Sequence, residues 1–431
     1  MAGPQSSARV EVVAGVSQAV MLSRLGGMST TRTAIVIGGG PAGLLAAAHL
    51  AGAGVESTLL EARGGLGGRA ASQREGGFDL NQGPHALYAG GPAMRELRAL
   101  GIRLDAWNPV APARSVFIRG GRVRRTPGGG GAALARWLAA AAKGAPPSPD
   151  IAHVSAAEWL DRSLDGAARD AGAALVRVTT FVADQDRLSA DVAAQQLRIG
   201  LNPGVRYLRG GWQSLADALA AEARRRGAVL RTGAAVRALD GQEGRWTVTL
   251  DDDELHADAV IVAGGDPDSA ARLLGDRAPA APGPPAEISS LDLGLRRLPK
   301  PMRRFALGLD QPTYLSRHSP PEQEGDQLLS LMSYARAPLA GLEAIADTVQ
   351  PGWRDETTLQ RHLPRMVACS AIATPHSGGL GGRPGVQVEP GLFVAGDWIG
   401  PEGWLTDASL ASAAAAARAA GGVGSTAALA A

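Results

Sequence analysis

Three glycines in the first tenth of the chain have the spacing of a phosphate-binding turn. Gly38, Gly40 and Gly43 form a G-x-G-x-x-G pattern after a short apolar run, Thr33–Ile37, and before a helix-like stretch of small residues. The first glycine allows a tight bend, the second lets backbone N–H groups approach a pyrophosphate, and the third lets helix and strand pack closely. The phosphate would lie at the helix N-terminus. The expected phosphate-binding residues are Gly38, Gly40, Pro41, Ala42 and Gly43.

An acidic residue closes the next apolar stretch. Glu61 ends the run that begins at Val55, and the two runs with the glycine turn between them indicate a βαβ unit of about 30 residues. An acidic side chain at this place accepts hydrogen bonds from the hydroxyls of an adenosine ribose and repels a 2′-phosphate, which disfavours NADP. The alternative is a solvated glutamate at the end of a strand.

A second glycine cluster follows the acidic residue directly. After Ala62 and Arg63 the chain reads GGLGGR, which ends in Gly67, Gly68 and Arg69. An ordinary NAD-binding domain does not need such a turn after its ribose-binding acid. The second cluster therefore favours FAD over NAD.

These segments, with four others, resemble one family of flavoproteins. The family joins phytoene (carotenoid) desaturases, protoporphyrinogen oxidase and flavin amine oxidases, and the phytoene-desaturase-like members are the most similar. The further matching segments cover residues 83–87, 210–236, 257–274 and 392–413 in the expected order. Together the matching pieces make up roughly a third of the chain, and they are specific for the fold and the cofactor rather than for the substrate.

The resemblance assigns roles to residues far apart in the chain. It implies that the GGR turn wraps the FAD pyrophosphate and that Asp397 meets the ribityl–phosphate part. It also implies that the loop Gly403–Thr406 leads into a helix whose N-terminus points at the flavin, where it stabilises negative charge. The backbone of Val236 would meet the adenine. The expected cofactor-binding residues beyond the first turn are Glu61, Ala62, Arg63, Gly67, Gly68, Arg69, Gly83, Pro84, His85, Val236, Gly396, Asp397, Gly403, Trp404 and Leu405.

Several of these residues have simpler explanations. Thr406 or Asp407 could be a plain helix N-cap, and Val236 could be a core valine. His85 belongs to a turn that in the family lies near the isoalloxazine ring. His85 could therefore be catalytic, by orienting substrate or moving a proton, or it could only satisfy a backbone carbonyl. The sequence also leaves open whether Trp212, Trp398 and Trp404 line a cavity or pack.

One departure from the family bears on the reaction. Many amine oxidases carry a lysine on a substrate-domain strand that reaches the flavin through water. The corresponding stretch, Ser289–Leu298, contains no lysine, and Lys300 lies between two prolines. This departure favours the desaturase-like branch, in which the flavin carries the chemistry.

Composition excludes several other classes of protein. The 431 residues are 45% hydrophobic and 19% charged, with a net charge of +2, so no nucleic-acid partner is indicated. A single cysteine, Cys369, excludes a disulfide framework and favours a cytoplasmic setting, and the histidines show no metal-ligand spacing. No run of 18 apolar residues is present, so no transmembrane segment is expected. The oligomeric state is left open.

The pattern of elements predicts an α/β fold with two domains. A Rossmann-like FAD-binding domain would be assembled from residues 33–80, 205–286 and 385–425. An inserted α+β substrate domain would comprise residues 81–204 and 287–384. Residues 1–32 are expected to be an N-terminal extension rather than a signal peptide.

The expected function is that of an FAD-dependent oxidoreductase. By resemblance it would remove hydride from an apolar small-molecule substrate, form a C=C or C=N bond, and pass electrons to oxygen or another acceptor. An amine oxidase or protoporphyrinogen-type oxidase is the nearest alternative, and an isomerase that uses reduced FAD is a further one. An alternative that is not an enzyme is a non-catalytic binding protein with the dinucleotide-binding fold, since prenylated-GTPase dissociation inhibitors share the fold without using flavin.

Overall fold

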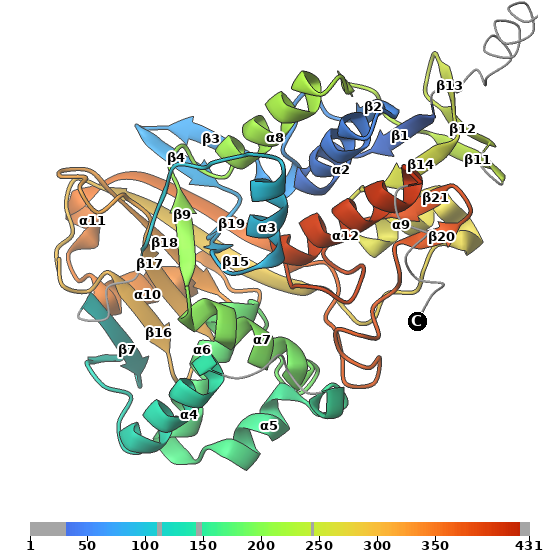
Figure 1. Cartoon of the computed structure of the whole chain (residues 1–431). Coiled ribbons are helices and arrows are strands. Elements are labelled where there is room, and N and C mark those ends of the chain that lie inside the picture. The colour runs from blue at the N-terminus through green and yellow to red at the C-terminus, as the bar shows by residue number, and fades with distance from the viewer. Residues whose placement is uncertain (1–31, 110–113, 144–148, 243–244, 423–431) are drawn as a thin grey trace, which may run out of the picture.

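The computed structural model describes residues 32–109, 114–143, 149–242 and 245–422. The expected extension lies outside these residues except for Arg32, and so do residues 423–425 of the last expected FAD segment. Two sheets organise the molecule, one at the top of Figure 1 and one at the left, with a group of helices below.

The first sheet is mainly parallel and has six strands. In spatial order they are β10 (Val229–Thr232), β2 (Glu56–Glu61), β1 (Thr33–Ile37), β14 (Ala259–Val262), β21 (Leu392–Val394) and β20 (Gln387–Glu389), with only the β20–β21 pair antiparallel. The central strands are nearly continuous apolar runs, as strands covered on both faces require. The order reverses at β1, where the connections leave to β2 on one side and eventually to β14 on the other. Ligands of open α/β sheets bind beyond the carboxyl ends of the strands at such a point.

Three helices cover one face of this sheet. They are α2 (Pro41–Gly52), α8 (Gln213–Arg225) and α12 (Thr406–Ala420), and they lie side by side in Figure 1. Leu44 and Leu45 of α2 are fully buried, and each such leucine contributes about 2 kcal/mol through burial. The many alanines of α2 and α12 leave little side chain between the two helices, so their backbones approach closely.

A small antiparallel sheet and one helix cover the opposite face. The sheet contains β11 (Ala238–Gln242), β12 (Arg245–Thr249) and β13 (Glu254–Ala257), and the helix is α9 (Pro267–Leu274). Ile35 packs with Trp246 and Val248 on this side, whereas its neighbour Val36 packs under α2. This alternation is the two-residue period of a strand.

The second sheet is mixed and has seven strands. In order they are β19 (Thr357–Cys369), β15 (Ala286–Leu295), β18 (Gln327–Ser333), β17 (Thr313–Arg317), β16 (Phe305–Gly308), β7 (Ser115–Arg119) and β8 (Arg122–Arg124). Only β16 and β7 pair in parallel, and β7 comes from a much earlier part of the chain. One face packs against α10 (Leu339–Val349) and α11 (Trp353–Glu356).

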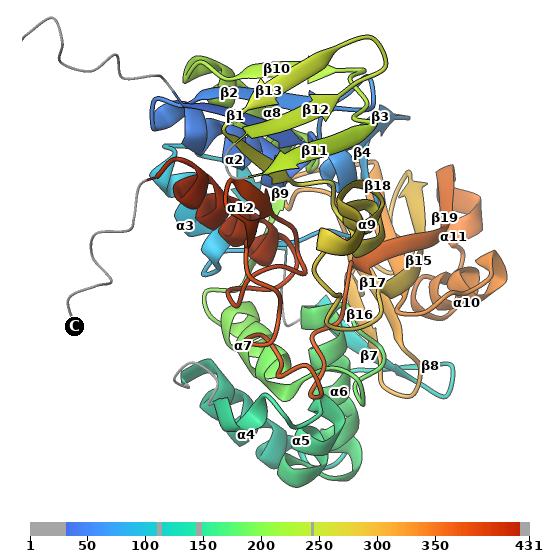
Figure 2. The same cartoon turned by 90° about the vertical axis from the view of Figure 1, so that its right-hand side faces the viewer.

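The other face of the seven-stranded sheet packs against a helical group. Its members are α4 (Gly131–Lys143), α5 (Ala156–Ser163), α6 (Gly166–Thr180) and α7 (Ala190–Leu201). Tyr314 and Met332 of the sheet and Val176 of α6 belong to one apolar cluster, which also contains Trp404 from the loop before α12. Figure 2 shows this loop descending from α12 toward α6 and α7.

Short elements join the two parts. They are β3 (Ser72–Glu75), β4 (Phe78–Asn81), β5 (Leu87–Tyr88), α3 (Pro92–Ala99), β6 (Ala106–Trp107), β9 (Val205–Leu208) and 3-10 turns at Gly68–Ala70, Pro149–Ile151 and Gly275–Arg277. All six strands of the first sheet come from the three segments predicted to form the FAD-binding domain. β9, at the start of the second such segment, pairs instead with β5 and β6, which belong to the other predicted domain. The domain boundaries themselves stay predictions.

Candidate functional site

The glycine turn after β1 combines close packing with an open backbone. Gly38 has φ +115°, and a β-carbon there would lie 2.7 Å from the backbone oxygen of Ala263. A β-carbon on Gly43 would lie 1.9 Å from the backbone oxygen of Gly38. At Gly40 a β-carbon would meet nothing within 4 Å, and no side chain caps the helix α2 that begins there. Two glycines are thus required by packing, while the third keeps an N-terminal helix end accessible to a phosphate.

The carboxylate of Glu61 is fixed at the carboxyl end of β2. It accepts hydrogen bonds from the backbone N of Gly39 at 2.7 Å and from that of Arg63 at 2.8 Å. The backbone N of Ala234 also donates to the backbone oxygen of Glu61, which brings the segment containing Val236 next to this strand end. The side chain of Val236 is partly buried against the third apolar cluster. Its backbone contact with adenine stays a prediction, and so does the ribose contact of Glu61.

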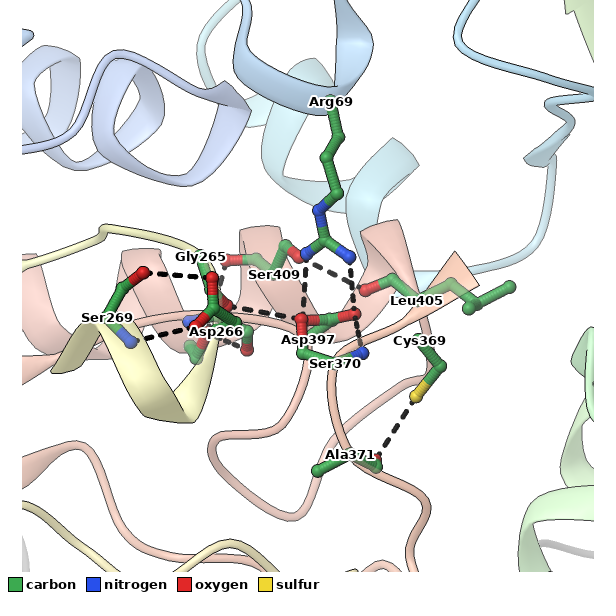
Figure 3. A network of polar contacts seen from close by, with 12 residues as sticks. Arg69, Gly265, Asp266, Ser269, Cys369, Ser370, Ala371, Asp397, Leu405 and Ser409 are labelled. Atoms are coloured by element: carbon green, nitrogen blue, oxygen red, sulfur yellow. Dashed lines mark hydrogen bonds and ion pairs between the residues drawn. The ribbon is translucent and has the colours of Figure 1, made fainter. Parts of the chain in front are cut away.

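The GGR turn folds back over the first turn. The backbone N of Gly67 donates to the backbone oxygen of Gly39 at 2.8 Å, and a β-carbon on Gly68 would lie 3.2 Å from the Cα of Gly40. The next residue, Arg69, extends toward the end of the chain. Its guanidinium donates to both carboxylate oxygens of Asp397, at 2.9 and 3.2 Å (Figure 3).

Asp397 is a buried anion held from two sides. It is 1% exposed and also accepts a hydrogen bond from the backbone N of Ser370 at 3.0 Å. Burial alone would raise its pKa, but Arg69 and the bond from Ser370 outweigh burial and keep the pKa of Asp397 below its ordinary value. The carboxylate is therefore ionised at neutral pH.

Two carboxylates predicted to bind one cofactor lie at the same edge of one sheet. Glu61 ends β2 and Asp397 follows β21, with β1 and β14 between these strands. Three strand spacings of about 4.8 Å separate β2 from β21 by about 14 Å. An extended dinucleotide that crosses the strand ends could reach both positions.

The start of α12 is not capped by either of the residues that the sequence suggested. The N-cap of α12 is Leu405, which has φ +53° and makes no side-chain capping bond. The suggestion that Thr406 or Asp407 caps this helix is therefore wrong. The carboxylate of Asp407 instead accepts a hydrogen bond from the backbone N of Ala93, in the first turn of α3. Consequently, no side chain makes a capping hydrogen bond at the N-terminus of α12.

Gly396 and Gly403 give this loop its path. The backbone N of Gly396 donates to the hydroxyl of Ser412 at 3.0 Å, which ties the end of β21 to α12. Gly403 has φ +76°, and a β-carbon there would lie 2.8 Å from the backbone of Asp407. Both glycines thus serve the close approach of loop and helix, whatever they contact in a cofactor.

The three tryptophans left open by the sequence are all nearly inaccessible. Trp398 and Trp404 are 2% and 0% exposed, and Trp212 is 3% exposed. The indole N of Trp404 donates to the backbone oxygen of Thr180 at 2.9 Å. The side chain of Trp404 therefore joins α12 to the helical group, which leaves its backbone for the predicted cofactor contact.

His85 lies in the turn after β4, where its ring is oriented from both sides. Its Nδ1 is 2.9 Å from the backbone oxygen of Gly83, and its ring centroid is 4.9 Å from that of Trp212. Burial, with a smaller contribution from the nearby charge of Arg69, lowers the pKa of His85 to about 4. His85 is therefore neutral at pH 7. Its catalytic role and the cofactor contacts of Gly83, Pro84 and His85 stay predictions.

Sequence reasoning missed an arginine beneath the site. Arg383 is 5% exposed and donates to the backbone oxygens of Asp397, at 3.2 Å, and Gly403, at 2.8 Å. Burial lowers its pKa to about 10, so the side chain stays charged. Arg383 positions the loop that carries the predicted flavin-side residues. The signal in the sequence was a second glycine–glycine–arginine turn, at residues 381–383.

Other candidate chemistry is absent from the described part of the chain. Cys369 is fully buried, and burial raises the pKa of its thiol. No group of three or more histidine, cysteine or acidic side chains among the described residues could hold a metal ion. Within the same residues, no helix has the length and apolar character needed to cross a membrane.

These observations fit FAD. Open glycine backbone follows both β1 and its neighbour β14, since β-carbons at Gly40, Gly264 and Gly265 would meet nothing within 4 Å. Two helices, α2 and α12, direct N-termini without side-chain caps to this edge. Such ends attract phosphate and a negatively charged ring.

Comparisons with known proteins agree with this geometry. The family model of flavin containing amine oxidoreductases matches residues 41–294. A phytoene dehydrogenase of Streptomyces griseus is 30% identical over 292 residues, and this match spans 58% of the chain and 57% of that protein's length.

Two solved structures share the fold at low identity. A putrescine oxidase variant has a TM-score of 0.69 at 17% identity, covering 90% of this chain and 98% of its own. Cyclohexylamine oxidase from Brevibacterium oxydans has a TM-score of 0.69 at 16% identity, covering 91% and 99%. The predicted fold class, a Rossmann-like domain with an inserted substrate domain, is confirmed. The chain belongs to the family of flavin containing amine oxidoreductases and is an oxidoreductase with FAD as its cofactor.

Proposed function

We propose that the chain removes hydride from an apolar small-molecule substrate to form a C=C or C=N bond, as a desaturase-like oxidoreductase. The 30% identity to a phytoene dehydrogenase supports this branch of the family. Oxygen or another small acceptor would then reoxidise the cofactor. A cytoplasmic location is part of the proposal and rests on the single, buried cysteine.

The apolar surroundings of the His85 turn carry the proposal. A β-carbon on Gly83 would lie 2.8 Å from the Sδ of Met366, so the turn rests on the last part of β19. Met366 in turn packs against the second apolar cluster, and so do Phe181 and Leu405. A hydrocarbon beside this turn would exchange contact with water for contact with these apolar side chains, which is favourable.

Two of these apolar residues have a strained backbone conformation. Phe181 and Leu405 have φ of +61° and +53°, and they are the only non-glycine residues with positive φ in the part of the chain described. The hydrogen bond from Trp404 to Thr180 joins the residues that precede them. Strained residues of this kind cluster at functional sites. Their placement supports a role in shaping the substrate space.

The protein would contribute position rather than acid–base chemistry. FAD, when bound, supplies the hydride acceptor. His85 is neutral at pH 7 and its Nδ1 is committed to Gly83, so it would orient the turn and the substrate. The open N-terminus of α12 would stabilise negative charge that develops nearby. The apolar cluster would keep water away from the reacting carbon.

Anaerobic bleaching of the bound flavin tests this function. Purified, FAD-loaded protein would be mixed without oxygen with a polyene, a porphyrinogen and a primary amine in turn, and the flavin absorbance followed. We expect bleaching with the polyene. Bleaching with the amine or porphyrinogen alone would contradict the proposal, and substrate conversion without net flavin reduction would point to an isomerase.

A further inference from the structure

An open pocket lies at one end of the seven-stranded sheet. Its volume is about 710 Å³, whereas the cavity beside His85, which Trp212 and His318 help to line, has about 210 Å³. The walls of the larger pocket are the loop from β15 to β16, the turn from β17 to β18, and α11. None of the residues that line it belongs to the predicted flavin site. A pocket of this size can hold a small molecule.

Strand pairing places three arginines side by side at this end of the sheet. β7, β16 and β17 are neighbours in it (Figure 1). The backbone N of Arg317 donates to the backbone oxygen of Arg304 at 2.8 Å, and the backbone N of Arg304 donates to that of Arg114 at 3.0 Å. Residues that pair across neighbouring strands extend their side chains from the same face of a sheet. These three residues form an arginine row.

The hydrogen bonds of the arginine row leave its charge unbalanced. Arg317 is 8% exposed, and its guanidinium donates only to uncharged oxygen atoms of residues 320–327. The Nε of Arg304 donates to the backbone oxygen of Pro301 at 3.0 Å. Neither guanidinium forms an ion pair with a carboxylate of the described residues.

The arginine row destabilises the protein while no anion is bound. Like charges on opposite residues of neighbouring strands repel each other. Burial, and then the charges of Arg304 and Arg114, lower the pKa of Arg317 to about 10. Glu322 opposes this effect only in part, because it is paired with Arg209. Arginine stays protonated at neutral pH, so the repulsion persists until an anion lies between the guanidinium groups.

Nitrogen atoms of the arginine row are accessible from the pocket. Arg304 and Arg317 both line it. The Nη1 of Arg317 and both Nη atoms of Arg304 donate to no described residue, and none of the three is among the described nitrogens that are buried without a partner. They therefore keep exposed surface. A guanidinium with unpaired N–H groups can donate two parallel hydrogen bonds to an oxyanion.

The acidic side chains of the pocket do not neutralise the arginine row. Glu356 is paired with Arg297 at 2.8 Å. Glu324 and Asp355 are exposed, and their carboxylates form no ion pair with a described residue. These two carboxylates are therefore solvated at the rim, whereas Arg317 is the least exposed charged residue of the wall.

We propose that this pocket binds a phosphate dianion, carried by a phosphorylated small molecule or a lipid headgroup, with Arg304 and Arg317 donating to its oxygens. A dianion relieves the repulsion among three cations better than a carboxylate, which has a single charge. The planar guanidinium also matches the spacing of phosphate oxygens. This site lies outside the predicted flavin site, so the inference does not depend on the proposed function.

Two matched anions test the preference for phosphate. Glycerol 3-phosphate is doubly charged at about pH 8, because its second pKa is about 6, whereas glycerate is a similar molecule with a single carboxylate charge. Calorimetric titration of FAD-loaded protein at constant ionic strength would give both dissociation constants, and the bound FAD prevents phosphate from entering the flavin site. We expect glycerol 3-phosphate to bind at millimolar concentration, at least about tenfold more tightly than glycerate.

A matched pair of variants assigns the donors. Arg304→Gln removes one charge of the arginine row and should weaken binding of glycerol 3-phosphate at least about tenfold. Arg122→Gln makes the same change at an exposed arginine of β8, outside the pocket, and should leave the affinity unchanged. Without ligand, Arg304→Gln should unfold at the same temperature as wild type or higher, because the repulsion within the row is relieved. The FAD content of each variant reports whether it has folded.

Several outcomes would overturn the inference. Glycerate that binds as tightly as glycerol 3-phosphate, no binding of glycerol 3-phosphate at millimolar concentration, or equal losses in Arg304→Gln and Arg122→Gln would each do so. Unchanged affinity in Arg304→Gln together with a lower unfolding temperature would show that the row is structural.

Vesicles identify the source of the phosphate group. The protein would be sedimented with phosphatidylcholine vesicles that contain or lack phosphatidic acid. Sedimentation that requires phosphatidic acid and is lost in Arg304→Gln, alongside binding of glycerol 3-phosphate, would assign a lipid headgroup. Binding of glycerol 3-phosphate without sedimentation would assign a soluble ligand.

Discussion

Glu61 presents a fixed negative charge because two backbone N–H groups hold its carboxylate. We expect Glu61→Gln to weaken FAD binding by about tenfold to a hundredfold, since an amide turns its NH₂ group toward one of these donors. Hydrogen bonds to charged groups contribute about 1.5–3 kcal/mol, and 1.4 kcal/mol is a factor of ten in affinity. Fluorescence titration of the apoprotein with FAD would measure the change.

Glu56 provides a control on the same strand. It is exposed at the other end of β2, far from the carboxyl edge of the sheet. Glu56→Gln should leave FAD affinity unchanged. Equal losses in both variants would mean that net charge, rather than the placement of Glu61, governs binding.

At the scale of the element, two glycines at the junction of β1 and α2 have different roles. Gly43 is needed for packing, and Gly40 is expected to be needed for FAD binding. Gly43→Ala places a β-carbon 1.9 Å from a backbone oxygen, which cannot move aside without shifting strand or helix. We expect a loss of roughly 1–3 kcal/mol in the free energy of unfolding, together with weak FAD binding. Gly40→Ala meets no atom within 4 Å, so it should fold normally yet bind FAD at least about tenfold more weakly. Chemical denaturation and FAD titration of both variants check this separation, and normal FAD affinity in Gly40→Ala would contradict it.

The contact between α12 and α3 should make stability depend on pH. One carboxylate oxygen of Asp407 bonds to the backbone N of Ala93, and the other is buried without a described partner. Burial raises the pKa of Asp407 to about 7, and Glu402 adds to this. Because the pKa is about 3.9 in the unfolded chain, the folded form binds the proton more tightly. Stability from this group is thus complete below pH 4 and is lost as pH rises through 7.

Asp407→Asn removes the charge and keeps an oxygen for Ala93. The free energy of unfolding of the variant relative to wild type should therefore increase by a few kcal/mol between pH 4 and pH 8. Urea denaturation at several pH values measures the difference. A difference that is constant over this range would show that Asp407 does not titrate there.

The part of the structure that could be predicted from the sequence also differs from element to element. The run Thr33–Ile37 and the glycines after it were sufficient to predict β1 and the turn to α2, because local period and local packing determine both. The alternative that Thr406 or Asp407 caps α12 failed, because Asp407 bonds to α3, more than three hundred residues earlier in the chain. The cavity beside His85 could not be predicted, since Trp212 and His318 come together only through the pairing of distant elements.

At the scale of the whole molecule, a buried ion pair links two strands of the seven-stranded sheet and ties them to the β3–β4 hairpin. Arg361 of β19 pairs with Asp292 of β15 at 2.5 Å and also donates to the backbone oxygen of Asn81 in β4. Asp292 is 3% exposed, and burial raises its pKa despite the arginine. Arg361→Met leaves this carboxyl group without its partner. We expect a loss of about 3 kcal/mol in the free energy of unfolding, because breaking a buried pair costs that much.

An exposed ion pair serves as the comparison. Arg162 and Glu158, one helical turn apart on α5, are both more than half exposed. Arg162→Met should change the free energy of unfolding by less than about 1 kcal/mol. Similar losses in the two variants would mean that burial of the Arg361–Asp292 pair adds nothing to its contribution to stability.

The return of the chain to its first sheet has a consequence for biosynthesis. β21 pairs with β14, and α12 packs on α2, so residues 392–420 complete a structure that the first strand began. While a ribosome is still adding these residues, the nascent protein has the glycine turn but neither Asp397 nor the second helix end. A site with Asp397 and both helix ends therefore exists only after residues up to α12 have been synthesised and have packed back onto the first sheet.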